Sequence, residues 1–303
     1  MLEDSTLPAK DRLRAFLAAG NRVALVATAI HRSGNTLSSY LQGQFKGDEK
    51  RLERALGRFL SRQNLQESPA FKPDFCMTSV AEDIIGALFQ AQIDGDIALV
   101  VGPSGVGKTW AAAYYANSEP GAYLVTATPA WSTQSLVASI ARRLELDRAS
   151  KLLDLLLAEV TEALRDSGAL VIVDEAQHLN SRSLETLRGL YDETGIGLAF
   201  VAQLQFYALL QRGDGRVSYD QLMNRVGVRL TLREAGLDDL TMLLPPATPA
   251  SVVKYLHTRT GGCLRAAVKT YARACRVAAT SGDGAAVTLQ LVKELLGDQR
   301  QGA

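Results

Sequence analysis

The fold is decided by one short stretch of this 303-residue chain, Gly102-Pro103-Ser104-Gly105-Val106-Gly107-Lys108-Thr109. It matches G-x-x-x-x-G-K-[ST], the phosphate-binding P-loop pattern. An apolar run from Ile97 to Val101 precedes it and predicts a buried strand, and Trp110 to Asn117 predicts the start of a helix. A glycine-rich turn without a ligand is the alternative, and it is disfavoured because the pattern and both flanks would have to coincide by chance. The stretch therefore predicts an α/β nucleotide-binding core.

Each part of this loop has a task in binding a nucleoside triphosphate. The glycines allow backbone N–H groups to close around phosphate oxygens, and the helix N-terminus adds partial positive charge behind them. Lys108 is expected to reach the β- and γ-phosphates, and the Thr109 hydroxyl to hold Mg2+. We therefore predict ATP and Mg2+ as cofactors, with the nucleotide lined by Gly102, Pro103, Ser104, Gly105, Val106, Gly107, Lys108, Thr109 and Trp110.

A second apolar run, residues 169–173, ends in the two carboxylates Asp174 and Glu175. This arrangement resembles a Walker B element, a buried strand with acid at its carboxyl end. Asp174 is expected to bind the Mg2+ shell and Glu175 to polarise the attacking water. A strand with a solvated acidic end is the alternative, and the P-loop at this spacing disfavours it. The chain is accordingly predicted to hydrolyse ATP.

Three more polar residues complete the predicted ATPase site. Gln203 follows the apolar run 197–202, where an amide can contact the γ-phosphate or the water; a simple strand cap is the alternative. Arg225 is expected to reach the γ-phosphate of a neighbouring subunit as an arginine finger, the alternative being a surface arginine. Arg265 follows Gly261-Gly262 in the first turn of a predicted helix and is expected to fold over the nucleotide as part of a lid. Arg265 belongs to a run of basic residues, and a solvated helix face is the alternative for this run: Lys254, Arg259, Arg265, Lys269, Arg273 and Arg276.

Residues 1–65 are predicted to form a small all-α helix-turn-helix domain that binds DNA. Two short helices, Arg22–Ile30 and Thr36–Leu41, are separated by a turn that contains Gly34. Leu37 and Leu41 share the face turned to the core. The outward side chains are suited to phosphates and base edges; these candidate DNA contacts are Ser33, Asn35, Thr36, Ser39, Tyr40 and Lys46. A helical bundle that binds protein is the alternative.

The remaining chain divides by composition. We predict a linker over residues 66–76, an α/β core with a parallel sheet over 77–233 and a helical lid and C-terminal domain over 234–303. Helices in this last region are expected to break at Pro245-Pro246 and Gly261-Gly262. Apolar content of 47% and charged content of 21% are typical of a globular protein, and a net charge of +1 does not by itself indicate a nucleic-acid partner. The three cysteines lack metal-site spacing and favour a reducing, cytoplasmic setting. No membrane partner is expected, because no apolar run approaches the ~20 residues of a span.

Taken together, the P-loop, Asp174-Glu175, the polar strand end, Arg225 and the Gly-Gly-x-Leu-Arg segment resemble the AAA+ ATPases. The run Asp-Glu-Ala-Gln-His-Leu from residue 174 looks like the branch of transposon target-selection ATPases. With the helix-turn-helix in front, nearly the whole chain is similar to the phage Mu B transposition protein family. The family has asparagine where this chain has Gln203, which places the amide further out.

This resemblance implies an ATP-dependent, largely non-specific binder of double-stranded DNA. Such proteins form helical filaments of many copies around DNA, in the cytoplasm of a bacterial host. They deliver the DNA to a DDE-type, Mu A-like transposase and stimulate it, and the transposase triggers hydrolysis. The expected DNA contacts inside the filament come from the loops 128–133 and 180–188, with Trp131, Arg182 and Arg188.

Two other functions are compatible with the motifs. A helicase loader or other replication ATPase has a similar core, and the N-terminal helix-turn-helix argues against it. A transcription regulator that uses ATP as a switch predicts one preferred DNA site and negligible turnover. A small-molecule kinase lacks support, since nothing resembles an acceptor site.

Overall fold

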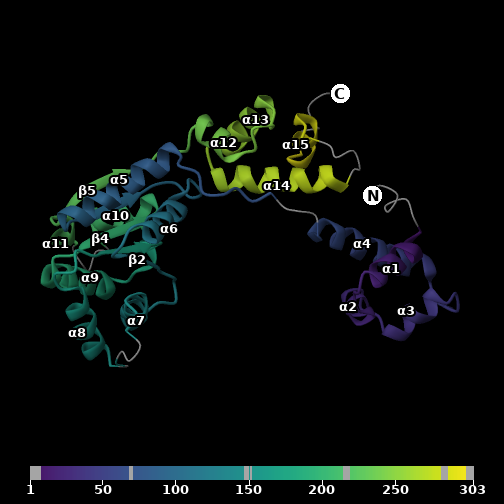
Figure 1. The fold of residues 1–303 in the computed structure, drawn as a ribbon, viewed down its shortest axis with the longest axis horizontal. Coiled ribbons are helices and arrows are strands. Elements are labelled where there is room, and N and C mark those ends of the chain that lie inside the picture. The colour runs from purple at the N-terminus through teal and green to yellow at the C-terminus, as the bar shows by residue number, and fades with distance from the viewer. Residues whose placement is uncertain are drawn as a thin grey trace. The chain divides into compact units, whose positions relative to one another are not determined.

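The computed structural model describes residues 8–67, 71–146, 150, 152–213, 219–280 and 286–297. Contacts between residues divide the chain into two compact units. The first contains residues 1–72 and 269–303, and the second contains residues 73–268. Figure 1 labels their helices and strands along the chain. The two units are described separately below.

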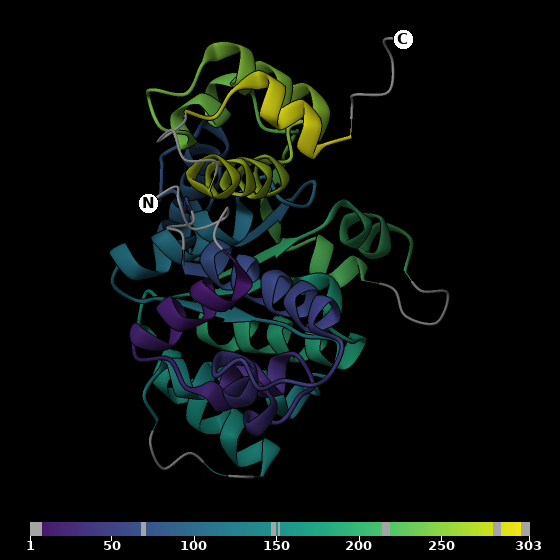
Figure 2. The same ribbon diagram turned by 90° about the vertical axis from the view of Figure 1, so that its right-hand side faces the viewer.

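The second unit is built on a five-stranded parallel sheet with the strand order β2-β3-β4-β1-β5. The ribbon views show its strands covered by helices (Figures 1 and 2). The predicted α/β core with a parallel sheet is therefore confirmed. The strands are β1 (Ile97–Val101), β2 (Ala122–Thr126), β3 (Leu170–Asp174), β4 (Gly197–Ala202) and β5 (Val226–Thr231).

The central strands are apolar throughout because helices cover both faces of the sheet. Every residue of β1, β3 and β4 is buried. Alternate residues of β1, among them Leu99, join a core with α7, α8, α9 and α10, and α5 packs on the sheet as well. The helices are α5 (Ser79–Asp94), α6 (Lys108–Ser118), α7 (Thr133–Arg143), α8 (Leu153–Leu164), the 3-10 helix η2 (Ala176–His178), α9 (Ser181–Thr194), α10 (Leu204–Arg212) and α11 (Asp220–Met223).

The predicted helical segment after the sheet is also confirmed, with its breaks at Pro245-Pro246 and Gly261-Gly262. It forms α12 (Leu237–Leu243), α13 (Ala250–Thr260) and α14 (Leu264–Thr280). The buried Asp239 of α12 accepts hydrogen bonds from the backbone N–H groups of Ser79 at 2.7 Å and Gly236 at 2.9 Å. This carboxylate therefore fastens the start of α12 to the start of α5. α15 (Leu289–Leu295) follows in the first unit.

Four N-terminal helices of the first unit share one hydrophobic core, which includes Leu13, Val26, Leu37, Leu52 and Leu56. They are α1 (Ala9–Ala18), α2 (Val23–Ala29), α3 (Gly34–Leu41) and α4 (Glu49–Glu67). The all-α character predicted for this region is confirmed.

Two local features of the N-terminal helices differ from the prediction. The turn between α2 and α3 uses the left-handed backbone of His31, with φ 53°, while Gly34 is the first residue of α3. α4 continues to Glu67 and so enters the segment predicted as a linker, of which residues 68–70 lie outside the described residues. The charged and polar residues near the end of α4 concealed its length, since they suit an exposed helix as well as a linker.

Candidate nucleotide-binding site

The predicted ATPase residues gather at the carboxyl edge of the sheet. The P-loop follows β1, Asp174 ends β3 and Gln203 follows β4, the strand that lies between them. Ligands of open α/β sheets bind at this edge, in the crevice beyond the strand ends. Parallel pairing therefore places segments about 70 and 100 residues beyond the P-loop at one site.

The P-loop has the backbone that its glycines predict. Gly105 and Gly107 have φ values of +82° and +112°, and a Cβ at Gly102 would lie 2.6 Å from that of Leu232. The Lys108 ammonium donates to the backbone carbonyls of Gly102 at 2.8 Å and Pro103 at 2.7 Å. Burial lowers the pKa of Lys108, while the nearby Glu175 and Asp174 carboxylates oppose that shift. Two backbone carbonyls of the loop thus hold the partly desolvated Lys108 ammonium.

Asp174 has the surroundings of a cation ligand. It is 2% exposed, and its Oδ2 has no hydrogen-bond partner. Its Oδ1 accepts the backbone N–H of Glu175 at 2.9 Å, and the Thr109 side chain lies near it. Burial raises the pKa of Asp174, and the Thr109 contact opposes that rise. A buried carboxylate with a free oxygen beside a hydroxyl fits Mg2+, which prefers hard oxygen ligands.

Gln177 is a functional candidate that the sequence reasoning missed. Its side-chain amide donates from Nε2 to the Glu175 carboxylate and accepts the backbone N–H of Gln203 through Oε1 at 3.2 Å. Glu175 itself has a left-handed backbone, with φ 54°. Gln177 therefore connects the predicted catalytic base to the end of β4. Its position two residues after Glu175 was visible in the sequence, but its partner Gln203 is 26 residues away.

The helix α14, which was expected to act as a lid, contacts the P-loop through Arg265. The backbone N–H of Arg265 donates to the Gly105 carbonyl at 3.1 Å, and its guanidinium lowers the pKa of Lys108. Arg265 is exposed, so it adds positive charge at the open side of the loop. Trp110 is 57% exposed on α6, one turn before Tyr114, whose ring stacks on Phe75 at 4.0 Å.

Arg225 lies at the amino-terminal ends of the strands, whereas the P-loop lies at their carboxyl ends. The residue after it, Val226, pairs with Ile97, the first residue of β1, whereas the P-loop follows the last residue of that strand. Its guanidinium forms an ion pair with Asp192 and donates to the Gln221 carbonyl at 2.6 Å. Arg225 is therefore remote from the P-loop of its own chain. The strand β5 that fixes this position was not predicted, because β5 alternates buried and exposed residues.

The two loops predicted to contact DNA are joined in the structure. The Thr133 and Ser183 hydroxyls, at the starts of α7 and α9, share a buried hydrogen bond of 3.1 Å. Arg182 beside them is exposed. Arg188, in contrast, forms ion pairs with Glu185 at 2.9 Å and Asp192 at 2.7 Å.

Trp131 is half-buried and packs against the core of the second unit, so most of its ring is not available for stacking. Of the three predicted contacts in these loops, Arg182 has the environment that a phosphate contact needs.

The prediction that Tyr40 faces outward is wrong. Its ring is 1% exposed, and its hydroxyl donates to Glu53 at 3.1 Å. This burial, together with the Glu53 carboxylate, raises the pKa of the phenol. The helix phase turns Tyr40 inward beside Leu37, because the two residues are three apart. The other predicted contacts reach the surface: Ser33, Asn35 and Lys46 are exposed, and Thr36 and Ser39 are half-buried.

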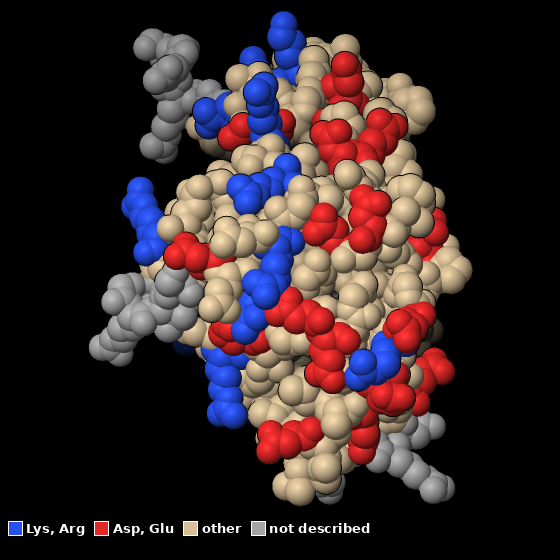
Figure 3. All heavy atoms as spheres, turned by 90° about the vertical axis from the view of Figure 1, so that its left-hand side faces the viewer, with Lys and Arg blue, Asp and Glu red and all other residues tan. Residues whose placement is uncertain are grey.

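Charges of both signs share the surface shown in Figure 3, where no single sign dominates. Among the described residues, no cluster of three or more histidine, cysteine or acidic side chains could hold a metal ion. A search of the same residues found no helix with the length and apolar content of a membrane span.

The parallel sheet, the P-loop and the buried Asp174 define a nucleotide-binding protein of the P-loop ATPase class. An AAA domain family model matches residues 93–210. The Mu-like prophage FluMu DNA transposition protein B of Haemophilus influenzae is 32% identical over 253 residues, which cover 80% of this chain and 87% of that protein. The ATP-dependent target DNA activator B of Escherichia phage Mu is 29% identical over 209 residues, 69% of this chain and 67% of that protein. The chain belongs to the Mu B family of AAA+ ATPases, which act in DNA transposition.

Proposed function

We propose that this chain binds duplex DNA in an ATP-dependent and largely sequence-independent manner and assembles around it as a helical filament. The filament delivers the bound DNA to a DDE-type, Mu A-like transposase and stimulates it, and the transposase triggers ATP hydrolysis and release. The printed names of the relatives, an ATP-dependent target DNA activator and a DNA transposition protein, support this proposal.

The position of Arg225 is the observation that carries the proposal. An arginine at the sheet edge opposite its own P-loop cannot complete that site, but it can complete the site of an adjoining copy. ATP is then a ligand of the joint between two protomers, and its binding energy favours assembly. Each added protomer brings more cations to the DNA, so avidity rises with filament length. Release of Arg225 from Asp192 accompanies formation of the joint.

The other residues of the site have separate roles in nucleotide binding and hydrolysis. Lys108 and Arg265 bind the phosphates, while Thr109 and Asp174 hold Mg2+, which neutralises charge on the β- and γ-phosphates when it is bound. Glu175 orients and polarises the attacking water, and the Gln203 amide senses the γ-phosphate. Phosphate loss removes the contact that Arg225 makes across the joint and so loosens the filament.

DNA contacts in this proposal come from both units. In the second unit, Arg182 and the adjoining loop 128–133 contact the phosphate backbone. In the first unit, the N-terminal helices add cationic contacts that carry no base specificity. DNA affinity is therefore expected to depend on both ATP and salt concentration.

The test compares DNA binding of the wild-type chain with Lys108→Ala and, as a matched control, Lys254→Ala on the exposed side of α13. We expect Lys108→Ala to lose ATP-dependent binding and Lys254→Ala to retain it, because only Lys108 lies in the P-loop. Equal binding by Lys108→Ala and wild type in the presence of ATP would refute the coupling. A second variant, Glu175→Gln, is expected to form filaments but to turn over ATP slowly, and unchanged hydrolysis would remove Glu175 from the role of base.

A further inference from the structure

The exposed side of α4 carries four cations in a pattern that the ATPase site does not use. Lys50, Arg54 and Arg58 follow one another at intervals of four residues, and Arg51 lies beside them; all four are exposed. We call these residues the α4 basic stripe. At 3.6 residues per turn they fall within an arc of about 100°, and the stripe extends for about 12 Å along the helix.

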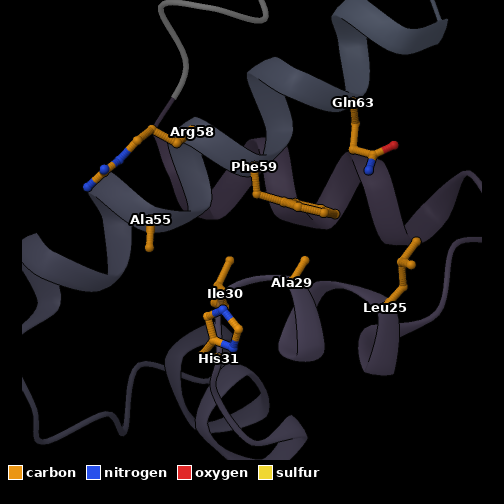
Figure 4. A pocket seen from close by; sticks show the side chains of 8 residues that line it. All are labelled: Leu25, Ala29, Ile30, His31, Ala55, Arg58, Phe59 and Gln63. Atoms are coloured by element: carbon orange, nitrogen blue, oxygen red, sulfur yellow. The ribbon is translucent and has the colours of Figure 1, made fainter.

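The helical periodicity of α4 places this stripe on its solvent-exposed side. The residues on the other side of the helix, among them Leu52, Leu56 and Phe59, are buried in the core of the N-terminal helices. A pocket of about 530 Å³ lies between α2 and α4, with Ala29, Ile30 and Phe59 in its lining. Arg58 also borders this pocket, together with His31 and Gln63 (Figure 4). The stripe therefore lies on the solvent-exposed side of α4, with Arg58 beside the mouth of a pocket of mixed polarity.

Within the described part of the chain, no ion pair joins a carboxylate to a stripe side chain, although the Asp48 carboxylate accepts the backbone N–H of Arg51 at 3.0 Å. The ion pair recorded among the described N-terminal helices joins Arg14 and Asp11 on α1. The Arg54 and Arg58 side chains donate only to backbone carbonyls of their own helix, at 3.2 and 3.3 Å. Glu53 is turned the other way, where it accepts the Tyr40 hydroxyl. The four stripe side chains are thus exposed and outside the recorded ion pairs, so the stripe presents a row of positive charge to solvent.

The helix α3, which was expected to contact DNA bases, has fewer side chains available for DNA contacts than α4. It has no charged residue from Gly34 to Leu41. The Ser33 hydroxyl, which caps it, is hydrogen-bonded to the Thr36 hydroxyl at 2.9 Å and accepts the Thr36 backbone N–H. Its aromatic side chain, Tyr40, is buried. Base readout would need free polar side chains on this helix.

We infer that the α4 basic stripe, rather than α3, is the surface through which the N-terminal unit contacts DNA, and that its ligand is the phosphate backbone of the duplex. The inference rests on the proposed function and specifies where this unit acts. A row of cations without exposed apolar side chains between them suits phosphates, which are contacted without regard to sequence. An acidic protein partner fits less well, because protein interfaces are enriched in aromatic anchors and the stripe has no aromatic side chain.

The experiment uses the full chain with a saturating non-hydrolysable ATP analogue and random-sequence duplexes over a salt series. The stripe variant is Lys50→Gln/Arg54→Gln/Arg58→Gln, and the matched control on α3 is Asn35→Ala/Ser38→Ala/Ser39→Ala. Each lost phosphate contact lowers the slope of log affinity against log salt by about 0.9. We expect the stripe variant to lose about 2.7 units of slope per bound protomer, equally for all duplexes, and the α3 variant to match wild type.

Other results would overturn the inference. They are an unchanged slope in the stripe variant, or loss of DNA affinity in the α3 variant. Unchanged DNA binding with lost stimulation of the transposase would assign the stripe to a protein partner and would also overturn it. A conservative variant, Lys50→Arg/Arg54→Lys/Arg58→Lys, is expected to restore the slope, and thermal unfolding of every variant checks the fold. Failure of the wild-type chain to bind DNA with ATP would refute the proposed function itself, which is a separate outcome.

Discussion

A methyl group added at Gly105 is the sharpest test of the nucleotide site. The backbone at Gly105 has φ +82°, and the new Cβ would lie 2.5 Å from Cys263 Sγ and 3.2 Å from Arg265 Cβ. A left-handed backbone costs a residue with a Cβ about 1–2 kcal/mol. If this strain falls on the phosphate-binding conformation, it alone corresponds to about a 5- to 30-fold loss of affinity. The contacts with Cys263 and Arg265 add to this loss, because either the loop or the start of α14 must move.

The assay is an equilibrium titration of Gly105→Ala with a fluorescent ATP analogue at fixed Mg2+. We expect nucleotide affinity to fall at least about tenfold, or about 1.4 kcal/mol. The ligand-induced increase in thermal stability should shrink with it. The matched control is Gly189→Ala in α9, where a Cβ meets nothing within 4 Å. Alanine at that helical position should stabilise the protein by about 0.5–1 kcal/mol and leave nucleotide affinity unchanged.

A Gly105→Ala protein that binds nucleotide within twofold of wild type would refute this reasoning. It would mean that the loop seen here is not the conformation that holds phosphate, or that the lid helix moves away at no cost. A fall in affinity with equal loss in the Gly189→Ala control would point to a general effect of the substitutions.

Three other substitutions test separate parts of the structure. Asp174→Asn removes a buried charge with an unpartnered oxygen, so thermal unfolding in EDTA should show a gain of about 1–3 kcal/mol, while Mg2+-dependent nucleotide binding is lost; a lower stability would contradict this. Gln177→Leu frees the Glu175 carboxylate, so steady-state ATPase assays should show a lower kcat with little change in KM, and a changed KM alone would exclude a positioning role. Tyr40→Phe removes the hydrogen bond to Glu53 and should lower the free energy of unfolding by about 0.5–1.5 kcal/mol in denaturant titrations. DNA affinity should not change, and a loss of DNA affinity would indicate that Tyr40 contacts DNA.

Features that depend on residues close together in the chain could be predicted before the fold was known. The P-loop could be recognised because Gly105, Gly107 and Lys108 lie within four residues and all take part in phosphate binding. The strands β1, β3 and β4 were readable because strands covered on both faces are apolar without interruption. The acidic end of β3 could be placed beside the P-loop, since parallel strands bring their carboxyl ends to one edge of the sheet.

Contacts between segments far apart in the chain could not be predicted in this way. Gln177 became a candidate because β4 brings Gln203 to its amide, a contact that no local pattern encodes. The helix phase turns Tyr40 inward beside Leu37, but its hydrogen-bond acceptor Glu53 comes from α4 and follows only from the packing of the two helices. Arg225 was placed at the far edge of the sheet by the register of β5, a strand whose alternating exposure gave a weak signal. These outcomes depend on packing between distant segments, and the free energy of such contacts is a property of the folded chain rather than of any short stretch of it.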